Sequence, residues 1–257
     1  MSASEIRPPD KQVRWHYRQV VNWFGPSLMR ALGGWQVSGR EKVPTEGAAL
    51  LCPNHVSYLD PPLVGVAVQF RRCCYMARAN LFRIPVLGWF IRKSYSYPVD
   101  RDEGGRQALR IAATLLAAGE LVVIFPEGTR SPDGDLMEGE PGAVFIASRA
   151  KVPIVPVAIW GTNIILPRHG GGLHRCPVYM KFGEPMHLPE PAEGQRLSKE
   201  QIQELTRELM SRIAALQAEL KQEIPQKVQD RAARLKARCD ARHPQDQGTT
   251  PPPTTTE

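Results

Sequence analysis

Short runs of apolar, β-branched residues alternate with helical patterns through the middle of the chain, and this alternation restricts the possible folds more than any other feature. Alternating strands and helices are typical of an α/β domain. We therefore predict an α/β fold in which helices flank a largely parallel or mixed sheet. The predicted strands cover residues 35–38, 48–52, 73–76, 121–125, 154–160 and 178–182. The predicted helices cover residues 61–68, 106–118 and 143–149.

A base and a carboxylate follow the predicted strand 48–52, in the segment Asn54-His55-Val56-Ser57-Tyr58-Leu59-Asp60. Asp60 precedes Pro61-Pro62. Proline disfavours a helical conformation in the residue before it, whereas Asp is common as a helix N-cap and Pro at the first helical position. We therefore predict a loop that carries His55 and a helix that begins near Pro61. Such a loop can bring the Asp60 carboxylate to one imidazole nitrogen and leave the other free to accept a proton, as general-base catalysis requires.

The His–Asp pair alone does not identify an active site, because loops often contain such pairs as ordinary hydrogen bonds or caps. Cys52 and Ser57 lie near His55 and are the candidate nucleophiles of this segment. Cys52 falls in the predicted buried strand, and Ser57 is more typical of a residue that bonds the loop. The chain also contains no Gly-x-Ser-x-Gly nucleophile elbow. We expect neither residue to act as a nucleophile.

A second motif, Phe125-Pro126-Glu127-Gly128-Thr129-Arg130, follows another predicted buried strand. Its glycine turn presents Thr129 and Arg130, and Arg recognises phosphate through a planar fork of donors. A surface turn with a solvated Arg and Glu is the alternative for this motif on its own. Both motifs follow strand ends, where α/β sheets place their functional sites. Together they indicate acyl transfer onto a phosphorylated alcohol.

The chain resembles the phospholipid and glycerol-phosphate acyltransferase family, in particular the bacterial 1-acylglycerol-3-phosphate acyltransferases. The resemblance covers roughly residues 35–188, and its four blocks come in the family's order. The blocks are residues 54–60, residues 81–89 leading to 97–101, residues 125–130 and residues 152–157. Four ordered blocks are far more specific than any one of them.

The resemblance implies that His55 is the general base that deprotonates the acceptor hydroxyl and that Asp60 orients it. The hydroxyl oxygen would then attack the thioester carbonyl of acyl-CoA or acyl-carrier protein directly, with no covalent acyl-enzyme, cofactor or metal. The implied substrate-binding residues are Arg78 near the thioester, and Arg101, Glu127, Gly128, Thr129 and Arg130 around the acceptor's phosphate.

Two positions depart from the family's pattern. Arg78 stands where many members have Lys, which keeps the charge but not the compact ammonium group. Gly139-Glu140-Pro141-Gly142 stands where the family often has Phe-Lys-x-Gly, so an anion replaces a cation.

The second departure leaves two acceptors open. The favoured acceptor is lysophosphatidic acid, which would give phosphatidic acid. The alternative is the same chemistry on another lysolipid, such as a lyso-ornithine lipid. A third hypothesis, a non-catalytic membrane lipid-binding protein, is disfavoured by the intact His55, Asp60 and Arg130.

The net charge of +7 predicts an anionic partner. We expect a lysophospholipid, an acyl donor and the membrane surface rather than nucleic acid, because no zinc-finger spacing, basic-region zipper or aromatic RNA-binding block occurs. The five cysteines form no Cys-x-x-Cys pair, so neither a disulfide framework nor a zinc site is favoured. No signal peptide or membrane-spanning run is found. We therefore expect a peripheral or monotopic protein on the cytoplasmic face of the membrane.

Three parts are predicted along the chain. Residues 1–34 form an amphipathic, membrane-associating helical segment, kinked near Gly25-Pro26, in which aromatic and Arg side chains meet the lipid interface. The alternative is that this segment packs on the domain. Residues 35–221 form the catalytic domain, including a helix over 198–220 with one apolar stripe. Residues 222–257 are charged and then Pro/Thr-rich, and we predict a mostly disordered tail.

Overall fold

The computed structural model describes residues 19–83, 95–99, 104–168, 172–190 and 195–242. Several predicted features lie outside these residues: the N-terminal residues 1–18, residues 84–94 of the second family block, Arg101, and the tail beyond residue 242.

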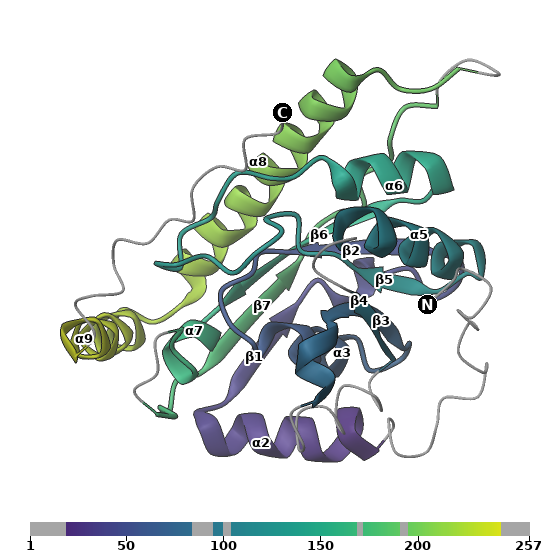
Figure 1. The fold of residues 1–257 in the computed structure, drawn as a ribbon. Coiled ribbons are helices and arrows are strands. Elements are labelled where there is room, and N and C mark those ends of the chain that lie inside the picture. The colour runs from purple at the N-terminus through teal and green to yellow at the C-terminus, as the bar shows by residue number, and fades with distance from the viewer. Residues whose placement is uncertain (1–18, 84–94, 100–103, 169–171, 191–194, 243–257) are drawn as a thin grey trace.

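A seven-stranded mixed sheet forms the centre of the molecule, with strand order β1-β7-β6-β2-β5-β3-β4 (Figure 1). The five neighbours β6, β2, β5, β3 and β4 run parallel, whereas β7 is antiparallel to β6 and carries β1 parallel to itself. The predicted α/β fold with a mixed sheet is confirmed. The strands are β1 Trp35–Ser38, β2 Ala49–Pro53, β3 Cys73–Arg78, β4 Ser96–Val99, β5 Leu121–Val123, β6 Ile154–Trp160 and β7 Val178–Phe182.

Strand β4 was not predicted from the sequence. It contains Pro98, which has no N–H to donate to a sheet and argues against a central strand. The structure places β4 last in the sheet order, so only one of its sides needs partners. An edge position is where a strand tolerates proline.

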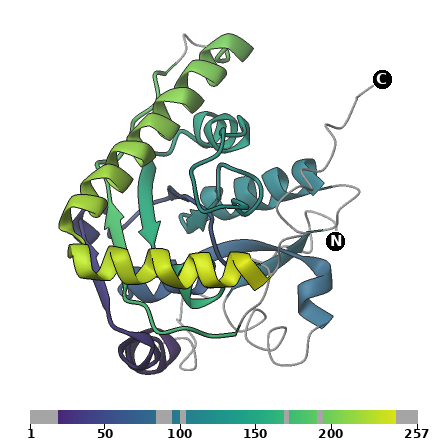
Figure 2. The same ribbon diagram turned by 90° about the vertical axis from the view of Figure 1, so that its left-hand side faces the viewer.

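Helices cover both faces of the sheet (Figures 1 and 2). One face carries α2 Gly25–Leu32, α3 Asp60–Val68, α7 Thr162–Ile165 and α9 Gln226–Arg242. The other carries α5 Gly104–Ala117, α6 Gly142–Ala150 and α8 Lys199–Glu223. Each face has its own buried apolar cluster.

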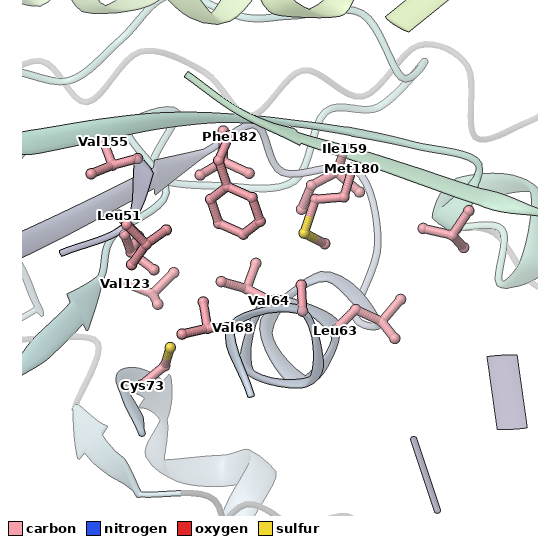
Figure 3. Close-up of a cluster of buried hydrophobic side chains, with 14 of the residues drawn as sticks. Leu51, Leu63, Val64, Val68, Cys73, Val123, Val155, Ile159, Met180 and Phe182 are labelled. Atoms are coloured by element: carbon pink, nitrogen blue, oxygen red, sulfur yellow. The ribbon is translucent and has the colours of Figure 1, made fainter. Parts of the chain in front are cut away.

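The central strand β2 contributes to both clusters, which explains why its sequence is apolar throughout. Leu51 packs with Val64 and Val68 of α3 (Figure 3), whereas Leu50 and Cys52 pack against α5 and α6 on the other side. Strands buried on both faces read as continuous apolar runs. The loop that follows β2 therefore starts from one of the most firmly held positions in the molecule.

The predicted helix 198–220 is confirmed as α8. Ser198 accepts a hydrogen bond from the Gln201 amide, and the Gln201 side chain accepts one from the Ser198 amide, which makes a capping box. Leu209 and Ile213 of its apolar stripe are fully buried. The helix ends just before Pro225, because the residue before proline avoids the helical conformation.

The prediction of a mostly disordered tail over 222–257 is wrong for residues 226–242, which form helix α9. Its polar composition favoured disorder, yet Val228, Ala232, Leu235 and Cys239 recur every three or four residues and face the domain. Lys236 also donates to the backbone carbonyl of Asp133. A short stripe of small apolar residues is enough here because the domain supplies the opposing surface.

The described part of the N-terminal segment is helical, with a π-helical turn η2 over Val20–Phe24 followed by α2. The change of helix type falls at Gly25, where a kink was predicted. Met29 is buried against the domain, whereas the Trp23 and Phe24 side chains are 70% and 62% exposed. The association of this segment with a membrane stays a prediction. Among the described residues, no helix has both the length and the apolar character needed to cross a bilayer.

Candidate active site

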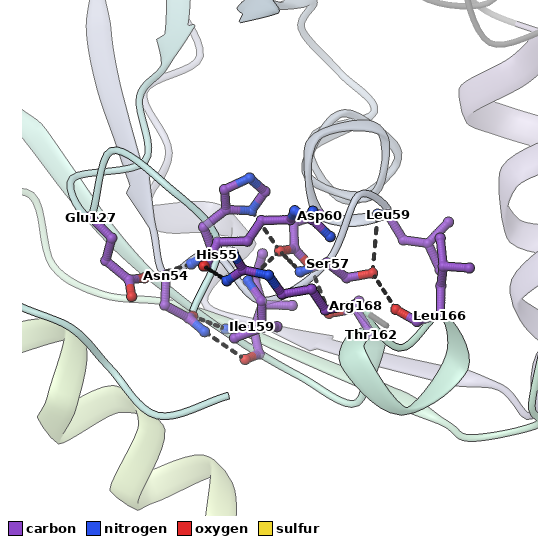
Figure 4. Close-up of polar contacts among 12 residues, drawn as sticks. Asn54, His55, Ser57, Leu59, Asp60, Glu127, Ile159, Thr162, Leu166 and Arg168 are labelled. Carbon is purple, nitrogen blue, oxygen red and sulfur yellow. Dashed lines mark hydrogen bonds and ion pairs between the residues drawn. The ribbon is translucent and has the colours of Figure 1, made fainter. Parts of the chain in front are cut away.

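Two loops meet at the carboxyl ends of the parallel strands. The loop after β2 carries His55, and the turn after β5 carries Glu127 (Figure 4). Strands β2 and β5 are direct neighbours, so their following residues emerge side by side. The predicted motifs, 72 residues apart between His55 and Glu127, are thereby brought together.

Asn54 fixes the start of the first loop. Its side-chain amide is buried and makes two hydrogen bonds to Ile159 of β6, donating to the carbonyl at 3.1 Å and accepting from the N–H at 2.7 Å. These two hydrogen bonds extend the pairing between β2 and β6 by one residue. The backbone of His55 therefore leaves the sheet in a defined direction.

His55 and Asp60 form the predicted pair. The Nδ1 of His55 lies 2.9 Å from Oδ2 of Asp60, whose side chain is fully buried. The same Oδ2 accepts hydrogen bonds from the backbone N–H groups of Val56 and Ser57, each at 2.7 Å, and Oδ1 accepts one from the Thr162 hydroxyl at 2.6 Å. Asp60 is thus held by four donors and cannot turn away from the imidazole.

The local chain explains this geometry. Asp60 is the first residue of α3, not its N-cap as the sequence suggested, and the N-cap position falls on Leu59. The carboxylate bends back toward Val56 and Ser57 because these loop amides point at it. Asp60 therefore orients the His55 imidazole instead of capping its own helix.

The contact to Asp60 determines which nitrogen of His55 carries the proton. An ionised carboxylate only accepts hydrogen bonds, so the Nδ1–H donates to it and a neutral imidazole keeps its lone pair on Nε2. Nε2 has no hydrogen-bond partner within the described part of the chain. The imidazole ring stacks on Phe125, with 4.0 Å between ring centroids, and its side chain is 15% exposed. Asp60 on one side and Phe125 against the ring face thus fix the orientation of the imidazole.

Glu127 holds the backbone of His55 from the second loop. One of its carboxylate oxygens accepts from the His55 backbone N–H at 2.6 Å and the other from the Met137 N–H at 3.0 Å. The His55 carbonyl in turn accepts from the Ser131 N–H at 2.8 Å. Both sides of the His55 peptide unit are therefore bonded to the turn after β5.

Burial raises the pKa of the Glu127 carboxyl above its usual value, and the His55 and Met137 amides partly oppose this effect. A carboxyl whose pKa is raised on folding stabilises the fold most when protonated, so its contribution declines as the pH rises through the raised pKa. Glu127→Gln cannot ionise. We expect the free energy of unfolding of this variant to rise relative to that of the wild type as the pH increases from mildly acidic to neutral, as measured by urea unfolding. A fall in the variant's free energy of unfolding relative to the wild type over this pH range would contradict a raised pKa for Glu127.

The turn Gly128–Arg130 directly follows Glu127 in the second loop. Gly128 has a φ of 68°, a left-handed conformation that side chains with a Cβ adopt only with strain. Thr129 is exposed, and the Arg130 guanidinium lies 3.6 Å from the ring centroid of Tyr58, a residue of the first motif. The Arg130 carbonyl accepts a hydrogen bond from Arg168 at 2.7 Å. Arg130 is therefore held between the two loops.

Comparison with known proteins agrees with this arrangement. A sequence model of the Acyltransferase family matches residues 34–160. The 1-acyl-sn-glycerol-3-phosphate acyltransferase of Bacillus subtilis is 32% identical over 191 residues, which make up 74% of this chain and 92% of that protein. The chain belongs to the acyltransferase family.

Two further relatives of this acyltransferase bear on its fold. The chloroplastic 1-acyl-sn-glycerol-3-phosphate acyltransferase LPAT1 of Arabidopsis thaliana is 31% identical over 181 residues, 66% of this chain and 50% of that protein. The crystal structure of the LPA acyltransferase PlsC from Thermotoga maritima superimposes with a TM-score of 0.63 and 28% identity, covering 84% of this chain and 86% of that one.

The other predicted substrate-binding residues are placed only in part. Arg78 is the last residue of β3, next to β5, so its backbone lies at the same sheet edge as the two loops. Arg101 lies outside the described residues. The roles of both in this acyltransferase stay predictions.

Neither candidate nucleophile of the acyltransferase is available for attack. Cys52 is fully buried, and burial raises the pKa of its thiol far above the usual range. The Ser57 hydroxyl donates to the Leu166 carbonyl at 3.3 Å and accepts from the Leu59 N–H at 3.4 Å. Within the described residues, no group of three or more His, Cys, Asp or Glu side chains could hold a metal ion.

Sequence reasoning missed Thr162, which completes the support of Asp60. A signal was present, because Thr162 follows the predicted strand 154–160 and so leaves the sheet at the same edge as His55. Gly161 makes the turn into α7, with a φ of 97° and a position where a Cβ would come within 2.4 Å of the Pro177 carbonyl oxygen. The acyltransferase therefore needs glycine there to deliver the Thr162 hydroxyl.

Proposed function

We propose that this acyltransferase moves a fatty acyl chain from the thioester of acyl-CoA or acyl-carrier protein to the free hydroxyl of 1-acylglycerol-3-phosphate, giving phosphatidic acid. The observation that carries this proposal is the His55–Asp60 pair, which engages Nδ1 and leaves Nε2 without a hydrogen-bond partner among the described residues, beside the turn that holds Arg130. Relatives named 1-acyl-sn-glycerol-3-phosphate acyltransferase support the choice of acceptor.

The reaction needs one proton shuttle. The His55 Nε2 takes the proton of the acceptor hydroxyl while the hydroxyl oxygen forms a bond to the thioester carbonyl carbon. The tetrahedral intermediate then collapses, the carbon–sulfur bond breaks, and the departing sulfur receives the proton from the imidazolium. Asp60 stabilises that imidazolium from its 2.9 Å contact to Nδ1. The products are the ester and a free thiol.

The phosphate of the acceptor would lie on the turn after β5. Arg130 supplies a guanidinium fork, Thr129 an exposed hydroxyl, and Gly128 lets the backbone approach closely. We assign Arg101 to the same phosphate and Arg78 to the thioester carbonyl. Glu127 acts by holding His55, since each of its carboxylate oxygens already accepts a backbone N–H.

Arg130→Gln is expected to raise the KM for lysophosphatidic acid about tenfold or more, because a charge-assisted bidentate contact to phosphate is lost. Initial rates at varied acceptor concentration measure this change. Arg149→Gln, on the exposed side of α6, removes the same charge away from the site and should leave the KM unchanged. A defect confined to kcat would contradict phosphate binding by Arg130.

A second acceptor is favoured by the position of Glu140. Its Cγ lies 3.4 Å from where a Cβ at Gly128 would be, and its backbone N–H donates to the Pro126 carbonyl at 2.7 Å. An anion therefore stands beside the proposed phosphate turn, which favours a headgroup that also carries a positive charge, such as that of a lyso-ornithine lipid. Competition by soluble glycerol 3-phosphate separates the two: inhibition supports the phosphate-bearing acceptor, and its absence supports the alternative.

We also propose that the enzyme works at the cytoplasmic face of the membrane as a peripheral or monotopic protein. Its acceptor has a long acyl chain and resides in the bilayer. Trp23, Phe24 and Leu28 of the segment η2–α2 expose apolar surface that suits the lipid interface.

A further inference from the structure

A hollow of about 440 Å³ lies where η2 and α2 meet strand β1 and the short helix η3 Arg40–Lys42. Helix α2 and β1 lie side by side at this edge of the molecule (Figure 1). None of His55, Asp60 and Glu127 lines this hollow, so it is separate from the candidate active site. We call it the Arg30/Arg40 hollow after its two charged lining residues.

The lining of the Arg30/Arg40 hollow favours an anion. Arg30 and Arg40 are cationic, and no Asp or Glu of the described residues lines it. Asn22 and Ser27 add an amide and a hydroxyl that can donate hydrogen bonds, and both are exposed. Two guanidinium groups with nearby neutral donors make the kind of set that binds phosphate oxygens.

Arg40 is incompletely satisfied in the protein alone. Its Nε is buried and has no hydrogen-bond partner among the residues that the structure describes. Its Nη1 makes one long contact of 3.4 Å to the Gln69 side chain, and its guanidinium carbon lies 5.9 Å from the ring centroid of Trp35. Burial lowers the pKa of Arg40. A buried donor without a partner is costly, so the Arg40 guanidinium has unmet hydrogen-bonding capacity at the wall of the hollow.

The position of the hollow points to the membrane as the source of that anion. Trp23 lines it while its side chain is 70% exposed, and Phe24 beside it is 62% exposed. Exposed aromatic residues next to arginine are typical of surfaces that sit at the headgroup level of a bilayer. If Trp23 and Phe24 enter the interface, headgroup phosphates lie at the depth of Arg30 and Arg40.

We propose that the Arg30/Arg40 hollow binds the phosphate group of an anionic membrane lipid, at a site distinct from the one that takes the acyl acceptor. The inference rests on the membrane association given under the proposed function. Such a site would increase the affinity of the enzyme for anionic bilayers, in addition to the attraction of its active site for a charged acceptor. The same donor set would also fit a free phosphate ion, and the experiment below distinguishes these two sources.

The test uses the full chain and measures its partition onto vesicles at constant ionic strength. One set of vesicles contains phosphatidylcholine alone, and the other also contains phosphatidylglycerol. We expect Arg40→Lys and Arg30→Gln each to weaken binding to the phosphatidylglycerol vesicles about fivefold or more, with little change on phosphatidylcholine alone. Arg40→Lys keeps the charge and loses the planar fork, so it separates a built site from general attraction. Arg149→Gln on α6 is the control for net charge.

Two results would overturn the proposal. One is full binding by both Arg40→Lys and Arg30→Gln, and the other is an equal loss in Arg149→Gln. Thermal unfolding checks that each variant is folded, and Arg30→Gln, at an exposed position, keeps the test valid if Arg40→Lys does not fold.

Inorganic phosphate then identifies the source of the anion. If inorganic phosphate competes with vesicles for the wild type but not for Arg40→Lys, the hollow also binds free phosphate. If inorganic phosphate does not compete, the hollow binds the phosphate of the lipid. Because no turnover is measured, an inactive acyltransferase would count against the proposed function and leave this result unaffected.

Discussion

Replacing His55 with alanine is expected to lower kcat by about 10²- to 10⁴-fold, the range by which a positioned general base accelerates proton transfer. Asp60 holds the Nδ1 of the imidazole at 2.9 Å, so Nε2 is the nitrogen that can accept the proton. The fold should survive, because the backbone of His55 keeps its bonds to Glu127 and Ser131. Steady-state kinetics and circular dichroism of the same preparation measure both effects.

His187→Ala is the matched control, since this histidine is exposed and distant in sequence from both motifs. It should retain full activity. A His55→Ala variant that turns over at the wild-type rate would refute general-base catalysis by this residue, and a variant that fails to fold would leave Asp60→Asn as the test of the same pair.

Asp60→Asn is expected to reduce both activity and stability. Val56 and Ser57 donate to Oδ2 and require an acceptor there, so the asparagine places its neutral carbonyl oxygen at that position, and the loss of the charged acceptor costs about 1–3 kcal/mol. The substitution also removes the negative charge beside Nδ1 that stabilises the imidazolium form of His55. We expect kcat to fall by a factor similar to that of His55→Ala.

Thr162→Val separates these two effects. It removes only the 2.6 Å hydrogen bond to Oδ1 of Asp60 and leaves the contact to His55 in place. Urea unfolding should show a smaller loss of stability than in Asp60→Asn, and kcat should fall far less. Equal losses in the two variants would contradict the division of roles between the two oxygens of Asp60.

The sequence was sufficient for the fold class and for the pairing of His55 with Asp60, because both depend on local patterns. Apolar β-branched runs marked the buried strands, and the proline pair after Asp60 marked the start of α3. Strand β4 was missed because Pro98 weakens the local signal while the sheet edge tolerates it. Helix α9 was missed because its stability depends on the surface it meets.

The rest of the site depends on contacts between distant segments. Thr162 reaches Asp60 across 102 residues, and Asn54 reaches Ile159 across 105. Phe125 was expected in the strand, yet β5 ends at Val123 and Phe125 stacks on the imidazole. No periodicity or spacing predicts which loop residues will touch once five parallel strands bring their ends together.

Thiol release from palmitoyl-CoA and from palmitoyl-acyl-carrier protein, by the purified chain in detergent, tests the central claim most directly. It should be measured with and without lysophosphatidic acid, for the wild type and for His55→Ala. We expect release that requires the acceptor, yields phosphatidic acid, and is lost in His55→Ala. Thiol release that does not depend on the acceptor, or that persists in His55→Ala, would contradict acyl transfer by His55.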